Sequence, residues 1–61
     1  MYIICKKNNT RIVRVTLYNN SIFIVQGYLS LTDLWYDISI YRNIADAMNR
    51  VNIIALHNTS I

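Results

Sequence analysis

Two pairs of asparagines, Asn8-Asn9 and Asn19-Asn20, stand eleven residues apart and interrupt runs of β-branched and apolar residues. Asparagine is the non-glycine residue that best tolerates the positive φ of a tight hairpin turn. Turns at this spacing are typical of an antiparallel meander. The strands predicted on either side of them are Tyr2 to Lys7, Thr10 to Tyr18 and Ser21 to about Leu31.

A third turn is expected at Thr32-Asp33, followed by a fourth strand from Leu34 to Arg42. Alternate side chains of a strand point to opposite faces, so this segment divides into two sets. The set assigned to the core is Leu34, Tyr36, Ile38 and Ile40, and the set assigned to the other face is Trp35, Asp37, Ser39 and Tyr41. A short helix around Leu31 to Tyr36 is an alternative, because Thr32 is also an acceptable helix cap.

The second and third predicted strands differ in how their apolar residues are distributed. In the second, Val13, Val15 and Leu17 alternate with Ile12, Arg14 and Thr16, which gives one apolar face and one mixed face. The third strand is apolar on both faces, as expected of a central strand or of one covered by a partner. Gly27, the only glycine, is predicted to mark a bulge or bend in it.

After residue 42 the apolar period changes from two to 3.6, which indicates a helix that extends to about His57. Asn43 is a good N-cap for it, and Asp46 in the first turn complements the helix dipole. The apolar stripe consists of Ile44, Ala47, Met48, Val51, Ile54 and Ala55, while Ile53 falls on the opposite, polar face.

These segments predict a single α+β domain over residues 1–61: a four-stranded antiparallel meander followed by one amphipathic C-terminal helix that packs on one sheet face. A sheet this apolar would then expose more hydrophobic surface on its other face than monomers usually do. We therefore expect a homodimer, which would also supplement the small core of a 61-residue chain. The residues predicted to form the protein interface are Phe23, Val25, Trp35, Tyr36 and Tyr41.

Residues that carry chemistry are scarce. The sequence contains no Glu, one His, one Cys and three acidic residues, and none has the spacing of a catalytic or metal-binding motif. Cys5 in an apolar strand is interpreted as a small buried hydrophobe, and His57 as a residue that suits the C-terminal end of the helix dipole. We therefore expect a protein that is not an enzyme and uses no catalytic residue, metal or cofactor.

The net charge of +3 permits a polyanionic partner without requiring one. Four cations, Lys6, Lys7, Arg11 and Arg14, cluster around the first predicted hairpin, and a two-stranded ribbon can enter a major groove. Arg42 and Arg50 could add phosphate contacts. An alternative function is therefore a small nucleic-acid-binding regulator, although charges around a turn also serve as a solubilising rim.

Composition favours a different main hypothesis. Apolar residues make up 54% of the chain and charged residues only 15%, and Trp and Tyr are common anchors of protein interfaces. No signal peptide or membrane span is predicted, and the lone cysteine fits a reducing compartment, so we expect a cytoplasmic protein. A chain this small, rich in Ile and Asn and poor in Lys, is expected of an accessory protein from a phage or mobile element. The main hypothesis is a homodimeric protein-binding module of this type that inhibits a larger host protein by masking its surface.

Overall fold

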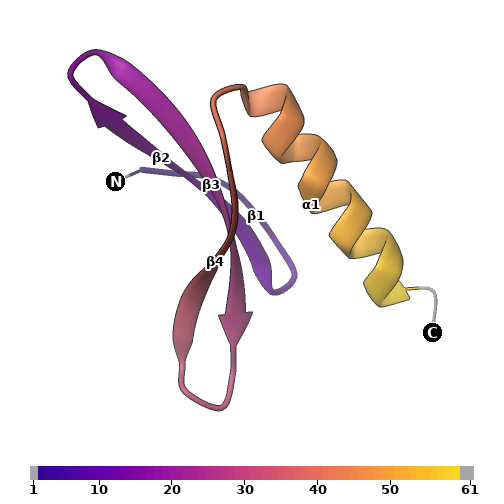
Figure 1. Cartoon of the computed structure of the whole chain (residues 1–61). Coiled ribbons are helices and arrows are strands. Elements are labelled where there is room, and N and C mark those ends of the chain that lie inside the picture. The colour runs from indigo at the N-terminus through magenta and orange to yellow at the C-terminus, as the bar shows by residue number, and fades with distance from the viewer. Residues whose placement is uncertain (1, 60–61) are drawn as a thin grey trace.

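The computed structural model describes residues 2–59 and contains one four-stranded antiparallel sheet followed by a helix (Figure 1). The strand order in the sheet is β1-β2-β3-β4, which is a simple meander. This architecture confirms the predicted α+β fold. The elements are β1 (Tyr2–Lys7), β2 (Thr10–Leu17), β3 (Asn20–Leu29), β4 (Leu34–Tyr41) and α1 (Ile44–Thr59).

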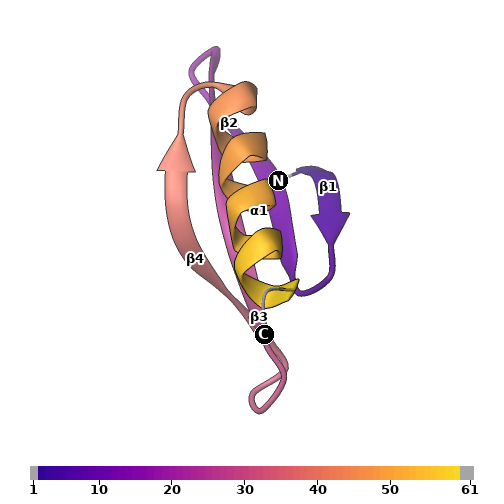
Figure 2. The ribbon, with the colours of Figure 1, turned by 90° about the vertical axis from the view of Figure 1, so that its right-hand side faces the viewer.

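The helix lies along one face of the sheet, over β2 and β3 (Figure 2). It begins where the sequence predicts, because the Oδ1 atom of Asn43 accepts a hydrogen bond of 2.8 Å from the amide of Ala45. It ends at Thr59, close to the predicted end at about His57, and the His57 side chain lies outside the described part of the structure. Within residues 2–59, no helix has the length and apolar character needed to cross a membrane.

The core lies between this helix and the two central strands. Ile12 and Val25 are fully buried against Ala47 and Val51 of the helix. The side chains that pack around them are Cys5, Phe23, Ile38, Tyr41 and Ile54. The placement of Phe23, Val25 and Tyr41 on the uncovered sheet face was therefore wrong, because the helix covers the face that these three residues share.

An extra residue in β4 explains the error at Tyr41. Val25 pairs with Ser39 while the next residue, Gln26, pairs with Asp37, so Ile38 is a β-bulge. After the extra residue, the side chains of β4 that a regular strand would point to one face point to the other. Tyr41, opposite Phe23, packs on the helix side, whereas Ile40, assigned to the core from the sequence, is opposite Ile24 and 59% exposed.

Gly27 does not form the predicted bulge. It pairs regularly with Thr10 on one side and Tyr36 on the other, and its φ is not positive. A Cβ atom at this position would lie 2.7 Å from the Cζ and Oη atoms of Tyr36. The glycine therefore provides the space in which the Tyr36 ring lies on the helix side of the sheet.

The segment from Gly27 to Asp37 forms the ends of two strands and a loop, not a short helix. Leu29 pairs with Leu34, and residues 30–33 make the connection. Asp33 has a φ of 56°, and the amide of Thr32 donates a hydrogen bond of 3.2 Å to the carbonyl of Leu29. The predicted turn at Thr32-Asp33 is therefore the second half of a four-residue loop.

The turn between β2 and β3 is one residue earlier than predicted. Tyr18 and Asn19 occupy the two loop positions with φ of 51° and 66°, as a type I′ turn requires. This turn pairs Ile12 with Val25 and Val13 with Ile24. A loop at Asn19-Asn20 would instead place Arg14 opposite Val25 and Ile12 opposite Gly27, so the position of the turn decides which residues meet across the strands.

A tyrosine with positive φ is strained, because its Cβ is close to the backbone carbonyl. Tyr18 is 95% exposed and gains no packing in return. We expect Tyr18→Gly and Tyr18→Asn to raise the free energy of unfolding by up to about 1 kcal/mol, as measured by urea denaturation. Tyr18→Ala keeps the same strained backbone and serves as the control. An equal gain in the alanine variant would show that loss of the exposed ring, not relief of strain, stabilises the protein.

Candidate functional site on the uncovered sheet face

The sheet face opposite the helix carries a row of aliphatic side chains that crosses all four strands. Ile3, Val13, Ile24 and Ile40 are paired in register from β1 to β4. Val13, Ile24 and Ile40 alternate with core residues along their strands, and Ile3 joins them because it pairs with Val13 beyond the bulge in β1, so all four lie on the uncovered face. We call these four residues the apolar row. Its two ends are open to solvent, with Ile3 50% and Ile40 59% exposed, whereas Val13 near its centre is fully buried.

A group of aromatic and basic side chains occupies the same face nearer to the β1–β2 turn. Tyr28 and Trp35 face each other across β3 and β4 with ring centroids 5.2 Å apart and an interplanar angle of 52°. The guanidinium carbon of Arg11 lies 4.1 Å from the centroid of the Trp35 ring, and the Lys6 Nζ lies 5.8 Å from it. Both distances fit cation–π contacts. We call these four residues the Trp35 cluster.

Hydrogen bonds across the sheet hold Arg11 in place. Its Nε donates to the Oε1 of Gln26 at 2.8 Å, and the Nε2 of Gln26 donates to the Oδ1 of Asp37 at 2.8 Å. The two bonds connect β2, β3 and β4 on the uncovered face. Arg11 is therefore oriented against the indole before any ligand binds.

A further hydrogen bond holds the other aromatic ring. The hydroxyl of Tyr28 donates to a carboxylate oxygen of Asp33 in the loop between β3 and β4. This bond, with a smaller contribution from desolvation, raises the pKa of Tyr28 above its ordinary value of 10.0. The phenol therefore stays neutral at physiological pH and acts as a donor that ties the loop to the sheet.

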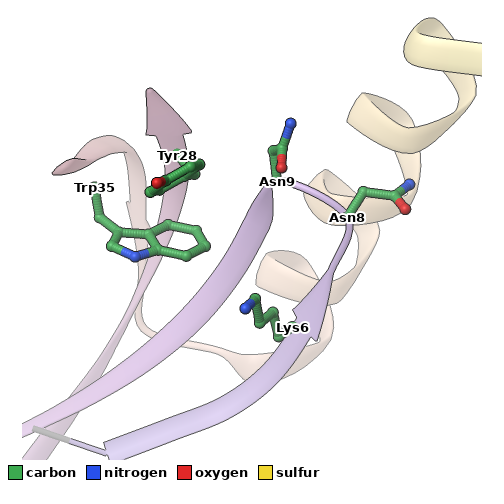
Figure 3. A pocket seen from close by; sticks show the side chains of 5 residues that line it. All are labelled: Lys6, Asn8, Asn9, Tyr28 and Trp35. Carbon is green, nitrogen blue, oxygen red and sulfur yellow. The ribbon is translucent and has the colours of Figure 1, made fainter. Parts of the chain in front are cut away.

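The Trp35 cluster borders an open pocket of about 360 Å³ beside the β1–β2 turn (Figure 3). Tyr28 and Trp35 form one side of it, and Lys6, Asn8 and Asn9 form the other. The pocket thus combines two aromatic rings, an ammonium group and the Asn9 amide, while the Asn8 side chain points away from the rings. Such a lining can hold a planar group and an anionic group at the same time.

The other predicted site residues do not join this cluster. Lys7 lies on the helix side, where it borders a pocket with Asn52 and Leu56. The Arg14 guanidinium lies 5.2 Å from the ring of Tyr2. Arg42 lines a separate pocket beside the β2–β3 turn, and Arg50 is exposed on the helix. Of the six cations considered for nucleic acid, the structure therefore brings only Lys6 and Arg11 to the Trp35 ring.

The predicted interface residues are likewise divided between the two faces. Trp35 is partly buried on the uncovered face, and Tyr36 is 52% exposed on the helix side above Gly27. Sequence reasoning missed Gln26 and Asp33, whose hydrogen bonds hold the cluster. Their roles depend on which residues are paired across the strands. The only sequence signal for this site was the alternation in the fourth strand, which placed Trp35 and Asp37 together on the face away from the core.

Among the described residues, no group of three or more His, Cys, Asp or Glu side chains is placed to hold a metal ion. No protein-family model, curated protein or solved structure gives a significant match to this chain. The candidate site is therefore defined by its own geometry: an aliphatic row bordered by a basic aromatic cluster on a sheet face without a covering layer.

Proposed function

We propose that this protein is a non-catalytic protein-binding module that forms a homodimer through the uncovered face of its sheet. The observation that carries the proposal is the apolar row, in which Ile3 and Ile40 remain half exposed or more in the single chain. A second copy related by a twofold axis would place the two rows against each other, as in a face-to-face sheet packing.

The size of the core supports this proposal. The fully or nearly fully buried hydrophobic residues of the described chain are Ile12, Val13, Val25, Ala47 and Val51. Only four of these, all except Val13, form the core between the helix and the sheet. Such a core contributes little stability, and small domains commonly compensate by oligomerisation. The two longest dimensions of the molecule, 41 and 25 Å, bound a face large enough for the roughly 800 Å² that each partner of a standard interface buries.

The edges of the sheet are less suitable for self-association than its face. Both edge strands contain a bulge: Ile4 is the extra residue in β1 and Ile38 the extra residue in β4. A bulge interrupts the ladder and twists the strand, which protects an edge against pairing with another chain. Face-to-face packing therefore remains the favoured mode.

A homodimer of this kind would leave the hairpin tips available for a larger protein, which we propose to be a host factor inhibited by masking of its surface. Tyr18 and Leu31 lie at the two loops that flank β3, at opposite ends of the sheet (Figure 1). They are 95% and 92% exposed, respectively. A strained, unpacked tyrosine at a hairpin tip is consistent with a role in binding.

Replacement of Ile40 by lysine tests the homodimer. The variant would place an unpaired ammonium group from each copy in the interface, so we expect the dimer Kd to rise at least about tenfold. The measurement is molar mass by light-scattering chromatography over a series of concentrations. The wild type is expected at twice the 7.2 kDa of one chain, and Ile40→Lys at 7.2 kDa.

Leu34→Lys is the matched control, because Leu34 is on the same strand, is 64% exposed and pairs with Leu29 on the helix side of the sheet. It should remain dimeric. A monomeric wild type, or equal dissociation of both variants with unchanged circular dichroism, would contradict the proposal.

A further inference from the structure

We propose that the pocket beside the Trp35 cluster binds a nucleotide unit, with the base stacked on the aromatic pair and the phosphate held by Lys6. The residues of this site are not those of the apolar row, although both lie on the uncovered face, so the proposal does not rest on the homodimer. Figure 3 shows Trp35 and Tyr28 on one side of the pocket and Lys6 and Asn9 on the other.

The aromatic pair suits a nucleobase. Tyr28 and Trp35 are tilted by 52° with centroids 5.2 Å apart, so the two rings form an angled wall rather than a closed stack. Bases stack on such side chains regardless of sequence, because every base has a π face. Tyr28 is held in position through its bond to Asp33, and Trp35 through its contact with Arg11.

The positive charges of Lys6 and Arg11 favour an anionic ligand. Lys6 and Arg11 both lie within 6 Å of the indole centroid, at 5.8 and 4.1 Å. An aromatic cage for a cationic ligand is therefore disfavoured, because its rings already contact two positive charges. The Nε–H of Arg11 is bonded to Gln26 and Arg11 does not line the pocket, whereas Lys6 is exposed and lines it. Lys6 is thus the group available to a phosphate.

The Asn9 amide completes the recognition of a nucleotide rather than of a simple anion. Asn9 lines the pocket beside Lys6 and is exposed, whereas the Asn8 side chain points away from the aromatic rings (Figure 3). An asparagine amide offers both a donor and an acceptor, which match the edge of an unpaired base. A base within a duplex does not expose this edge or its face, so the ligand is a single-stranded nucleic acid or a free nucleotide.

The intrinsic fluorescence of Trp35 gives a direct test, because it is the only tryptophan in the chain. The full chain is titrated with an oligothymidylate about eight nucleotides long, with the same strand in duplex form, with AMP and with inorganic phosphate. We expect saturable quenching by the single strand and none by phosphate alone. Equal affinity for AMP and the oligonucleotide would assign the site to free nucleotides, and tighter binding of the oligonucleotide would assign it to single strands.

Lys6→Ala and Lys7→Ala form a matched pair, since both remove one positive charge from adjacent residues but on opposite faces of β1. We expect Lys6→Ala to weaken binding at least about tenfold and Lys7→Ala to change it less than about twofold. Labelled-oligonucleotide anisotropy provides a second readout, in which Trp35→Phe retains binding and Trp35→Leu loses it. Circular dichroism confirms that each variant is folded.

The proposal is overturned if the two lysine variants weaken binding equally, or if an acidic peptide of the same charge competes as well as the oligonucleotide. Either result would mean that net charge alone attracts the ligand. Because a second copy could cover the pocket, the titration is repeated with Ile40→Lys. Absence of saturable quenching in both the wild type and this variant also overturns the proposal.

Discussion

Replacing Ile12 by alanine is expected to lower the free energy of unfolding by about 2 to 5 kcal/mol. Ile12 is fully buried and lies between β1, β3 and the helix, where it contacts the main core cluster. Proteins of this length have a total stability of roughly 3 to 9 kcal/mol, so the substitution should remove a large share of it. The measurement is urea denaturation followed by circular dichroism at one fixed protein concentration, because dimerisation makes stability concentration dependent.

Ile53→Ala is the control for this prediction. Ile53 lies in the helix and is 37% exposed, so its replacement removes less buried surface, and alanine is the better helix former. We expect the free energy of unfolding to change by less than about 1 kcal/mol. If Ile12→Ala were no more destabilising than Ile53→Ala, the helix would not cover this face of the sheet.

Replacing Ala47 by aspartate is expected to destabilise the protein by about 3 to 5 kcal/mol. Ala47 is fully buried at the point where the helix packs on Val25 and Ile12. A carboxylate there would lose its hydration without gaining a cationic partner, and it would also separate the helix from the sheet. Thermal unfolding by circular dichroism should show loss of the cooperative transition or a large decrease in Tm.

Replacing Ala45, two residues earlier, by aspartate should instead raise the stability of the protein. Ala45 is exposed in the first turn, where its amide already bonds to the Asn43 side chain. An aspartate at this position faces the positive end of the helix dipole and should stabilise the protein by about 0.3 to 1 kcal/mol. Destabilisation of equal size at both positions would mean that helix propensity, not burial, controls the effect.

The helix was the most predictable part of this protein. The apolar period of 3.6 and the Asn43 cap depend only on residues close in the chain. The same period identifies Ala47 and Val51 as the residues that face the sheet. Secondary structure in the sheet was almost as predictable, since the first hairpin and the fourth strand begin where turn residues indicate. These are local properties, which a single sequence encodes directly.

The candidate site was only partly predictable. Trp35, Lys6 and Arg11 were identified as residues of interest, but for two different functions and not as neighbours. Their contact arises because β2 pairs with β1 on one side and with β3 on the other, and β3 in turn pairs with β4. Side chains from separate strands meet only when the register of every intervening pair is known, and a shift of one residue would move them to opposite faces.

By itself, the sequence determined the order of elements, the meander and the helical stripe, because turn chemistry and apolar periodicity act over a few residues. The tertiary structure alone decided which face the helix covers. The Tyr18-Asn19 turn aligned Ile12 with Val25, and the Ile38 bulge moved Tyr41 to the core and Ile40 to the surface. Both outcomes depend on contacts between residues of neighbouring strands that are far apart in the sequence. In such contacts, the packing of apolar surfaces outweighs the preference of any single residue.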